Sequence, residues 1–218
     1  MRVYHFVNEK HGIQNLQKKR LKIATLRELN DPFELFGVEM TNEQVRRAFE
    51  NMKNQLSENR GILCFSEIWN NPVMWSHYAN RHAGLCLGFE IPEECLGKIH
   101  YSRRRVVADL EKLSNTSSLS LDDAKKFLFT KYSHWRYEKE HRSFVTLEEK
   151  DPETGLYFAD FSDRLRLESI IVGARSTLSR TDISSALGKQ SASVEVFKAR
   201  LAFRTFNVVR QRNDKLWA

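Results

Sequence analysis

Two glutamates and an arginine recur at alternate positions in the segment 135–145 (WRYEKEHRSFV). In a β-strand, Glu138, Glu140 and Arg142 would point to the same face of the sheet. Two carboxylates side by side repel each other unless a cation or a substrate balances their charge, and Arg142 is a candidate for part of that balance. The segment therefore predicts either a charged site on a strand face or an exposed edge strand with a solvated charged face.

Two segments nearer the N-terminus also carry polar side chains beside turns. Tyr4 and His5 lie on a predicted strand that is followed directly by a helix. Residues Asn30–Glu34 (NDPFE) are typical of a turn or a helix start, because Asn and Asp satisfy free backbone donors and proline fits an early helical position. We expect Asp31 to cap this turn, and its carboxylate is also a candidate to reach the wall of a site.

A short predicted helix, Met74–Ala79 (MWSHYA), lies between two apolar segments. Trp75 and Tyr78 are one turn apart on this helix and therefore lie near each other, whereas His77 points elsewhere. Aromatic residues at this spacing most often belong to a core. Tyr78 and His77 are amphipathic, however, and they flank the turn at Gly84. The helix is thus predicted to supply either core residues or part of a binding site.

The composition is that of an ordinary globular protein, with 218 residues of which 41% are hydrophobic and 11% aromatic. The net charge of +7 permits contact with phosphates or acidic surfaces without requiring it. The run Arg103–Arg105 is either a solvated loop or a phosphate-binding element. Three cysteines without a CxxC pair give no zinc or disulfide signature. The start does not resemble a signal peptide, and no apolar stretch approaches the about 18 residues of a membrane span. We therefore expect a cytoplasmic protein with no membrane partner.

Apolar runs and amphipathic periods follow one another without regular βαβ spacing. This pattern predicts an α+β fold in which a split or curved mixed sheet is flanked by helices. We expect a single domain, 1–218, with a helical insertion around 38–60 and a polar excursion around 101–123. Strands are expected at residues 3–7, 21–24, 61–66, 84–91, 138–145, 167–173 and 193–202. Helices are expected at residues 9–20, 42–55, 73–82, 122–133 and 179–187.

Five segments, in order and spacing, resemble the bacterial family catalogued as domain of unknown function 2971. The resemblance covers nearly the whole chain, but it implies no activity. The five segments are Asn30–Glu34, Cys64–Glu67, Met74–Ala79, Gly84–Phe89 and Trp135–Arg142.

A wider resemblance, in the order of elements and polar residues, is to the ADP-ribosyltransferase fold. That superfamily binds NAD with a His or Arg on its first strand, a Ser or Tyr on a central element and a Glu at the start of a later strand. The chain departs from this pattern after His5, where the usual Gly or Thr is missing. The catalytic residues implied by the resemblance are His5, Tyr78, Glu138 and Glu140. The residues expected to bind NAD beside them are Tyr4, Asp31, Trp75, His77 and Arg142.

These residue types suit cleavage of the nicotinamide–ribose bond, which builds positive charge on the sugar ring. One carboxylate would stabilise that charge, and the second would activate the nucleophile as a general base. A tyrosine ring would stack on the cationic nicotinamide, a histidine would hydrogen-bond a ribose hydroxyl, and an arginine would bind phosphate or pin a glutamate. We therefore expect an ADP-ribosyltransferase-like or NAD-cleaving enzyme, a bacterial toxin or phage-defence effector, whose acceptor is a protein or a nucleic acid. Neither a GxGxxG motif nor a P-loop is present, which disfavours a Rossmann or P-loop nucleotide site.

Two other function classes stay open. The first is a metal-dependent nuclease or nucleic-acid-binding protein, with Arg103–Arg105 on phosphate and carboxylates as metal ligands. The second is a non-catalytic interaction or sensor domain. The sequence does not indicate the oligomeric state. The carboxylates that would serve a nuclease are Asp31, Glu34, Glu138 and Glu140.

Overall fold

Alternating apolar residues give the central strands two buried faces, as a sheet covered on both sides requires. On β11 (Arg166–Val172), Ile170 and Val172 belong to one buried cluster and Ile171 belongs to the other. The same alternation occurs on β5 (Leu85–Glu90). The computed structural model describes residues 1–26, 28–29, 33, 37, 39–105, 128–189 and 193–217.

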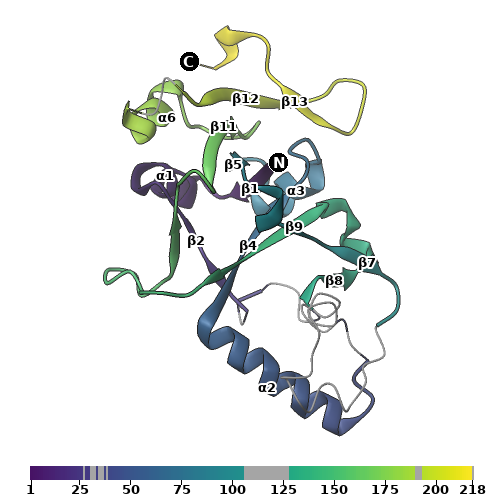
Figure 1. Cartoon of the computed structure of the whole chain (residues 1–218). Coiled ribbons are helices and arrows are strands. Elements are labelled where there is room, and N and C mark those ends of the chain that lie inside the picture. Colours follow the sequence, from purple (N-terminus) through teal and green to yellow (C-terminus); the bar gives the residue numbers. More distant parts are fainter. Residues whose placement is uncertain are drawn as a thin grey trace.

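Nine of the described strands form one mixed sheet (Figure 1). Neighbouring strands in this sheet are antiparallel, except for the parallel pair β11 and β12. The order across the sheet is β13 (Val208–Arg210), β12 (Glu195–Leu201), β11, β5, β1 (Arg2–Val7), β4 (Arg60–Ser66), β9 (Glu140–Thr146) and β6 (Gly97–Lys98), with β3 (Ala24–Thr25) paired to β4. Two smaller pairs are β2 (Arg20–Lys22) with β10 (Phe158–Asp160), and β7 (His100–Ser102) with β8 (Thr130–Tyr132).

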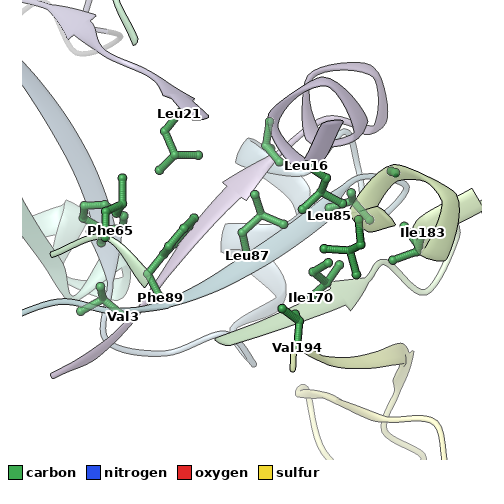
Figure 2. Close-up of a cluster of buried hydrophobic side chains, with 14 of the residues drawn as sticks. Val3, Leu16, Leu21, Phe65, Leu85, Leu87, Phe89, Ile170, Ile183 and Val194 are labelled. Carbon is green, nitrogen blue, oxygen red and sulfur yellow. The ribbon is translucent and has the colours of Figure 1, made fainter. Parts of the chain in front are cut away.

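Helices cover both faces of this sheet. On one face, α1 (Glu9–Lys18) and α6 (Arg180–Leu187) pack on the larger core cluster (Figure 2). On the other face, α3 (Pro72–Tyr78) buries Met74 and Trp75 against a second cluster. A longer helix, α2 (Glu43–Asn59), lies at the far end of the molecule from α6 (Figure 1). The described 3-10 helices are η1 (Glu93–Cys95), η3 (Ser133–Glu138) and η5 (Asp214–Leu216).

The sheet is split between β1 and β4. These two strands pair at one position, Tyr4↔Ser66, whereas β1 pairs with β5 along its whole length. On its other side, β4 pairs with β9 from Arg60↔Thr146 to Ser66↔Glu140. The two halves of the sheet therefore diverge beyond Tyr4, and the space between them is available for side chains rather than backbone hydrogen bonds.

The predicted α+β fold with a split mixed sheet is confirmed. The helix predicted at 42–55 is present as α2, and its status as an insertion stays a prediction. The helix predicted at 73–82 ends at Tyr78, because the chain adopts positive φ angles from Asn80 to His82. None of the helices that the structure describes is both long and apolar enough to cross a membrane.

Two predicted elements need correction. The helix predicted at 122–133 is wrong over Thr130–Tyr132, which forms strand β8, and residues 122–127 lie outside the described part of the chain. The strand predicted at 138–145 begins at Glu140 instead, because Glu138 ends the 3-10 helix η3. Most of the polar excursion and all but one residue of the turn at 30–34 also lie outside the described residues.

Candidate active site

A cavity of about 130 Å³ lies where β1 and β4 diverge. It brings together, from four different elements, the four residues that were predicted to be catalytic. Apolar side chains form most of the remaining wall, so charged groups in this cavity are shielded from water. The described residues that line it are Tyr4, His5, Phe6, Leu29, Cys64, Phe65, Ser66, Met74, Tyr78, Lys131, Glu138 and Glu140.

Glu138 and Glu140 reach the cavity from consecutive elements rather than from one strand. Between them, Lys139 adopts a left-handed conformation with φ 45° and ψ 51°, which closes η3 and turns the chain into β9. The Ser66 hydroxyl donates to the Glu138 carbonyl at 2.6 Å, and the Glu67 amide donates to the Lys139 carbonyl at 3.0 Å. Strand β4 thus fixes the turn that carries both carboxylates.

Lys131 bridges the two carboxylates. Its Nζ donates to Glu138 Oε2 at 2.7 Å and to Glu140 Oε2 at 2.9 Å, and its side chain is 5% exposed. This ammonium group supplies a charge balance that the sequence analysis missed. A signal was present, since Lys131 lies in the mostly apolar and aromatic run Leu128–Tyr132, where an unpaired charge would be costly to bury.

Arg142 supplies the rest of the balance, as predicted. Its Nε donates to Glu140 Oε1 at 2.8 Å and its second guanidinium nitrogen donates to Glu140 Oε2 at 3.2 Å. A third donor contacts the Leu128 carbonyl at 2.9 Å. The guanidinium therefore lies behind Glu140 and orients it, and it is not among the described residues that line the cavity.

The two carboxyl groups differ in protonation behaviour. Burial raises the pKa of Glu140, but Arg142 and Lys131 outweigh this effect and hold the pKa at about 2. Burial also raises the pKa of Glu138, and here the hydrogen bonds from Lys131 and Tyr78 do not fully compensate, so the pKa stays above its usual value. Glu140 is thus ionised at neutral pH, whereas Glu138 binds a proton more readily than a free carboxyl group does.

Tyr78 and His5 reach the cavity from α3 and β1, respectively. The Tyr78 hydroxyl donates to Glu138 Oε1 in a short hydrogen bond. His5 Nδ1 lies 3.1 Å from the Cys64 carbonyl, which only accepts, so Nδ1 carries the proton. Burial lowers the pKa of His5, which leaves the imidazole neutral with Nε2 as an acceptor. Tyr4, from the same strand, also lines the cavity.

The structure does not bring all predicted binding residues to this cavity. Trp75 is fully buried, and its indole donates to the Trp69 carbonyl at 2.6 Å, so it belongs to the core. His77 is exposed, with its ring 6.0 Å from Tyr78 and 6.2 Å from Tyr137. Asp31 lies outside the described residues.

A second cavity, of about 270 Å³, shares Lys131 with the first. Three consecutive exposed arginines, Arg103–Arg105, contribute to its wall, and the described lining contains no acidic residue. A cation-rich cavity therefore adjoins the carboxylate cavity. The other described lining residues are Phe33, Gly37, Ser102, Thr130 and Tyr132.

Within the described ranges, no three His, Cys, Asp or Glu side chains are arranged to hold a metal ion. The Lys131 ammonium also takes the position between the two carboxylates that a bridging cation would need. Comparisons with protein-family models, curated proteins and solved structures found no match to this chain. The site is therefore interpreted from its own geometry.

Proposed function

We propose that this chain is an NAD-using enzyme that breaks the nicotinamide–ribose bond, in the manner of ADP-ribosyltransferases. The observation that carries the proposal is the convergence of two carboxyl groups of different proton affinity, a tyrosine and a neutral histidine on one small cavity. The expected chemistry needs these groups together, because positive charge develops on the sugar ring as the bond breaks.

Each carboxyl group suits one role. Glu140 is ionised at any ordinary pH, so it would stabilise the developing positive charge of the ribose. Glu138, with its raised pKa, would take the proton of the attacking nucleophile as a general base. Lys131 and Arg142 hold both groups in place before substrate binds, which reduces the rearrangement required at the moment of reaction.

The cavity has the size of a single ring. Its volume of about 130 Å³ is near that of engineered cavities of about 150 Å³ that hold benzene. A whole dinucleotide needs a site of some hundreds of Å³, and the two cavities reach that size only when the adjoining one of about 270 Å³ is included. We infer that the nicotinamide would lie beside Tyr78, and that the phosphates would extend past Lys131 toward Arg103–Arg105.

The acceptor of the ADP-ribosyl group would be water, a protein or a nucleic acid. A toxin or a phage-defence effector would use either outcome, since loss of NAD and modification of a target both stop growth. His5 Nε2 would accept a hydrogen bond from a ribose hydroxyl and thereby fix the sugar.

The test is release of nicotinamide from NAD by the purified protein, followed by chromatography. Glu138→Gln and Glu140→Gln keep the size of each side chain, and each should lower the rate at least about 100-fold, the usual worth of a general base or a charge-stabilising group. Glu153→Gln is the matched control, because Glu153 is exposed, pairs with Lys18 and does not line the cavity. Its rate should equal that of the wild type.

The proposal is wrong if the wild type and both glutamine variants release nicotinamide at the same rate. It is also wrong if none of them releases nicotinamide above background. Divalent-metal-dependent cleavage of nucleic acid that is lost in Glu138→Gln would point to a nuclease instead. Absence of both activities would leave the interaction-domain hypothesis.

A further inference from the structure

The β12–β13 hairpin lies at the edge of the sheet farthest from β9 (Figure 1). Phe203 is 91% exposed and Phe206 is 98% exposed, both in the turn between the two strands. The fold does not need them, because the hairpin is anchored by Phe197, Ala199 and Val208, which are buried in the core on α3. Two fully exposed phenylalanines in one short turn indicate a surface that binds something.

Arginines lie beside the Phe203 ring. An open concavity of about 430 Å³ is bordered by the hairpin, and its described lining contains no acidic residue. Arg200 lies over the Phe203 ring, with its guanidinium carbon 4.5 Å from the ring centre. Of the four arginines that line the concavity, Arg210 forms an ion pair with Glu195, and the described residues give the other three none. The surface is therefore cationic and aromatic at once. The described lining residues are Arg200, Ala202, Phe203, Arg204, Thr205, Val209, Arg210 and Arg212.

We propose that this hairpin binds single-stranded nucleic acid. A base would stack on Phe203, whose ring remains largely exposed although Arg200 lies over it, and Arg204 and Arg212 would contact the neighbouring phosphates. Flat apolar rings interleaved with guanidinium groups match the alternation of bases and phosphates along a single strand. This inference does not depend on the cleavage of NAD.

Charge and shape favour this occupant over two others. A second copy of the chain, related by a two-fold axis, would place arginines against arginines. An anionic membrane surface would satisfy the charges but requires no concavity, whereas a volume of about 430 Å³ is enough to receive a nucleotide unit.

The experiment is fluorescence anisotropy with labelled oligothymidylate and oligouridylate of about 12 nucleotides. The double variant Phe203→Ala/Phe206→Ala should weaken binding at least about 10-fold, because base stacking on each ring is lost. Arg204→Gln/Arg212→Gln should weaken binding and lower the slope of log affinity against log salt by about 0.7 for each phosphate contact removed. All four residues are exposed, so thermal unfolding should be unchanged in both variants.

A charge-matched control distinguishes binding at the hairpin from general electrostatic attraction between the basic protein and the oligonucleotide. Lys10→Gln/Lys189→Gln removes two exposed positive charges, on α1 and just after α6, and should retain the wild-type affinity. Equal losses in this control and in the arginine variant would overturn the proposal, as would oligonucleotide binding that ignores the phenylalanine variant. Binding of the wild type to phosphatidylserine vesicles but not to oligonucleotides, or a dimer dissociated by Phe203→Ala/Phe206→Ala, would assign the surface to a lipid or to a second copy. Nicotinamide release is measured on the same variants and should not change, so failure of either proposal is seen separately.

Discussion

Two arginine–glutamate pairs lie toward opposite edges of the same sheet and differ mainly in their access to water. Arg142 and Glu140 on β9 have side chains that are 0% and 6% exposed. Arg210 on β13 and Glu195 on β12 are 51% and 49% exposed. Removing one partner leaves a buried charge in the first pair and a hydrated charge in the second. The burial of a pair, and not the pairing itself, therefore decides how much stability the protein loses when one partner is removed.

The largest expected effect is a direct test of this difference. Arg142→Met should lower the free energy of unfolding by about 3–5 kcal/mol, because Glu140 would stay buried with only Lys131 as a counter-charge. Arg210→Met should cost about 0–1 kcal/mol. Urea denaturation of both variants measures the two values, and similar losses would mean that burial does not separate the pairs.

Lys131→Met should have the next largest effect. Both carboxylates would lose their shared ammonium, and we expect a loss of about 2–3 kcal/mol at pH 7, less than for Arg142 because Glu138 can take up a proton. Adding Glu138→Gln to this variant should restore part of the loss, as a double-mutant cycle would show. Lys18→Met, which breaks an exposed pair with Glu153, is the control and should cost no more than about 1 kcal/mol. A strictly additive cycle would contradict a shared role for Lys131.

The two glutamates should respond to pH with opposite signs. Folding lowers the pKa of Glu140 from 4.5 to about 2, so its contribution to stability is present above pH 4.5 and is lost as the pH falls toward 2. Glu140→Gln should remove this part of the acid loss. Folding raises the pKa of Glu138, so its contribution is present below pH 4.5 and is lost as the pH rises through the folded value. The difference in urea midpoint between variant and wild type should thus change with pH in opposite directions for Glu140→Gln and Glu138→Gln between pH 2 and pH 8. Parallel profiles of the two differences would refute the assignment.

The smallest effect concerns the tyrosine beside Glu138. Tyr78→Phe removes the hydroxyl that donates to Glu138 and should cost about 1 kcal/mol, while further raising the pKa of that carboxyl group. Tyr137→Phe is a suitable control, since the Tyr137 hydroxyl makes no hydrogen bond within the described part of the chain, and its cost should be near zero. Thermal unfolding gives the stabilities, and a carboxyl-carbon NMR titration gives the pKa. An unchanged titration of Glu138 in Tyr78→Phe would rule out the proposed contact in solution.

The central strands were predictable because burial leaves a mark on the sequence. The apolar runs of β4, β5 and β11 predict these strands, and the helix predicted at 9–20 is present as α1. Short strands such as β6 and β13 have too few residues to show a period, and they depend on neighbours distant in the chain. They could not be found from local pattern.

The candidate site was predicted in part. The pairing of Arg142 with Glu140 follows from alternation in a strand, and the structure has it. The prediction that Glu138 lies in a strand was wrong, because the left-handed turn occurs at Lys139 and not at a glycine, which would have indicated it in the sequence. The sequence does not single out Lys131, because its segment is predicted to be helical and its contact with the two glutamates depends on tertiary structure.

The single paired position between β1 and β4 has a mechanical consequence. The strands within β13-β12-β11-β5-β1 and within β4-β9-β6 are joined by more pairs than β1 and β4 are, so we expect the sheet to bend most readily where these two parts meet, at Tyr4 and Ser66. Strain applied to the molecule would concentrate at that junction, where few hydrogen bonds oppose rotation. The candidate cavity lies in the same place. We therefore expect the width of the cavity to change more readily than the pairing within either part of the sheet, with the hydrogen bond between His5 and the Cys64 carbonyl opposing that change.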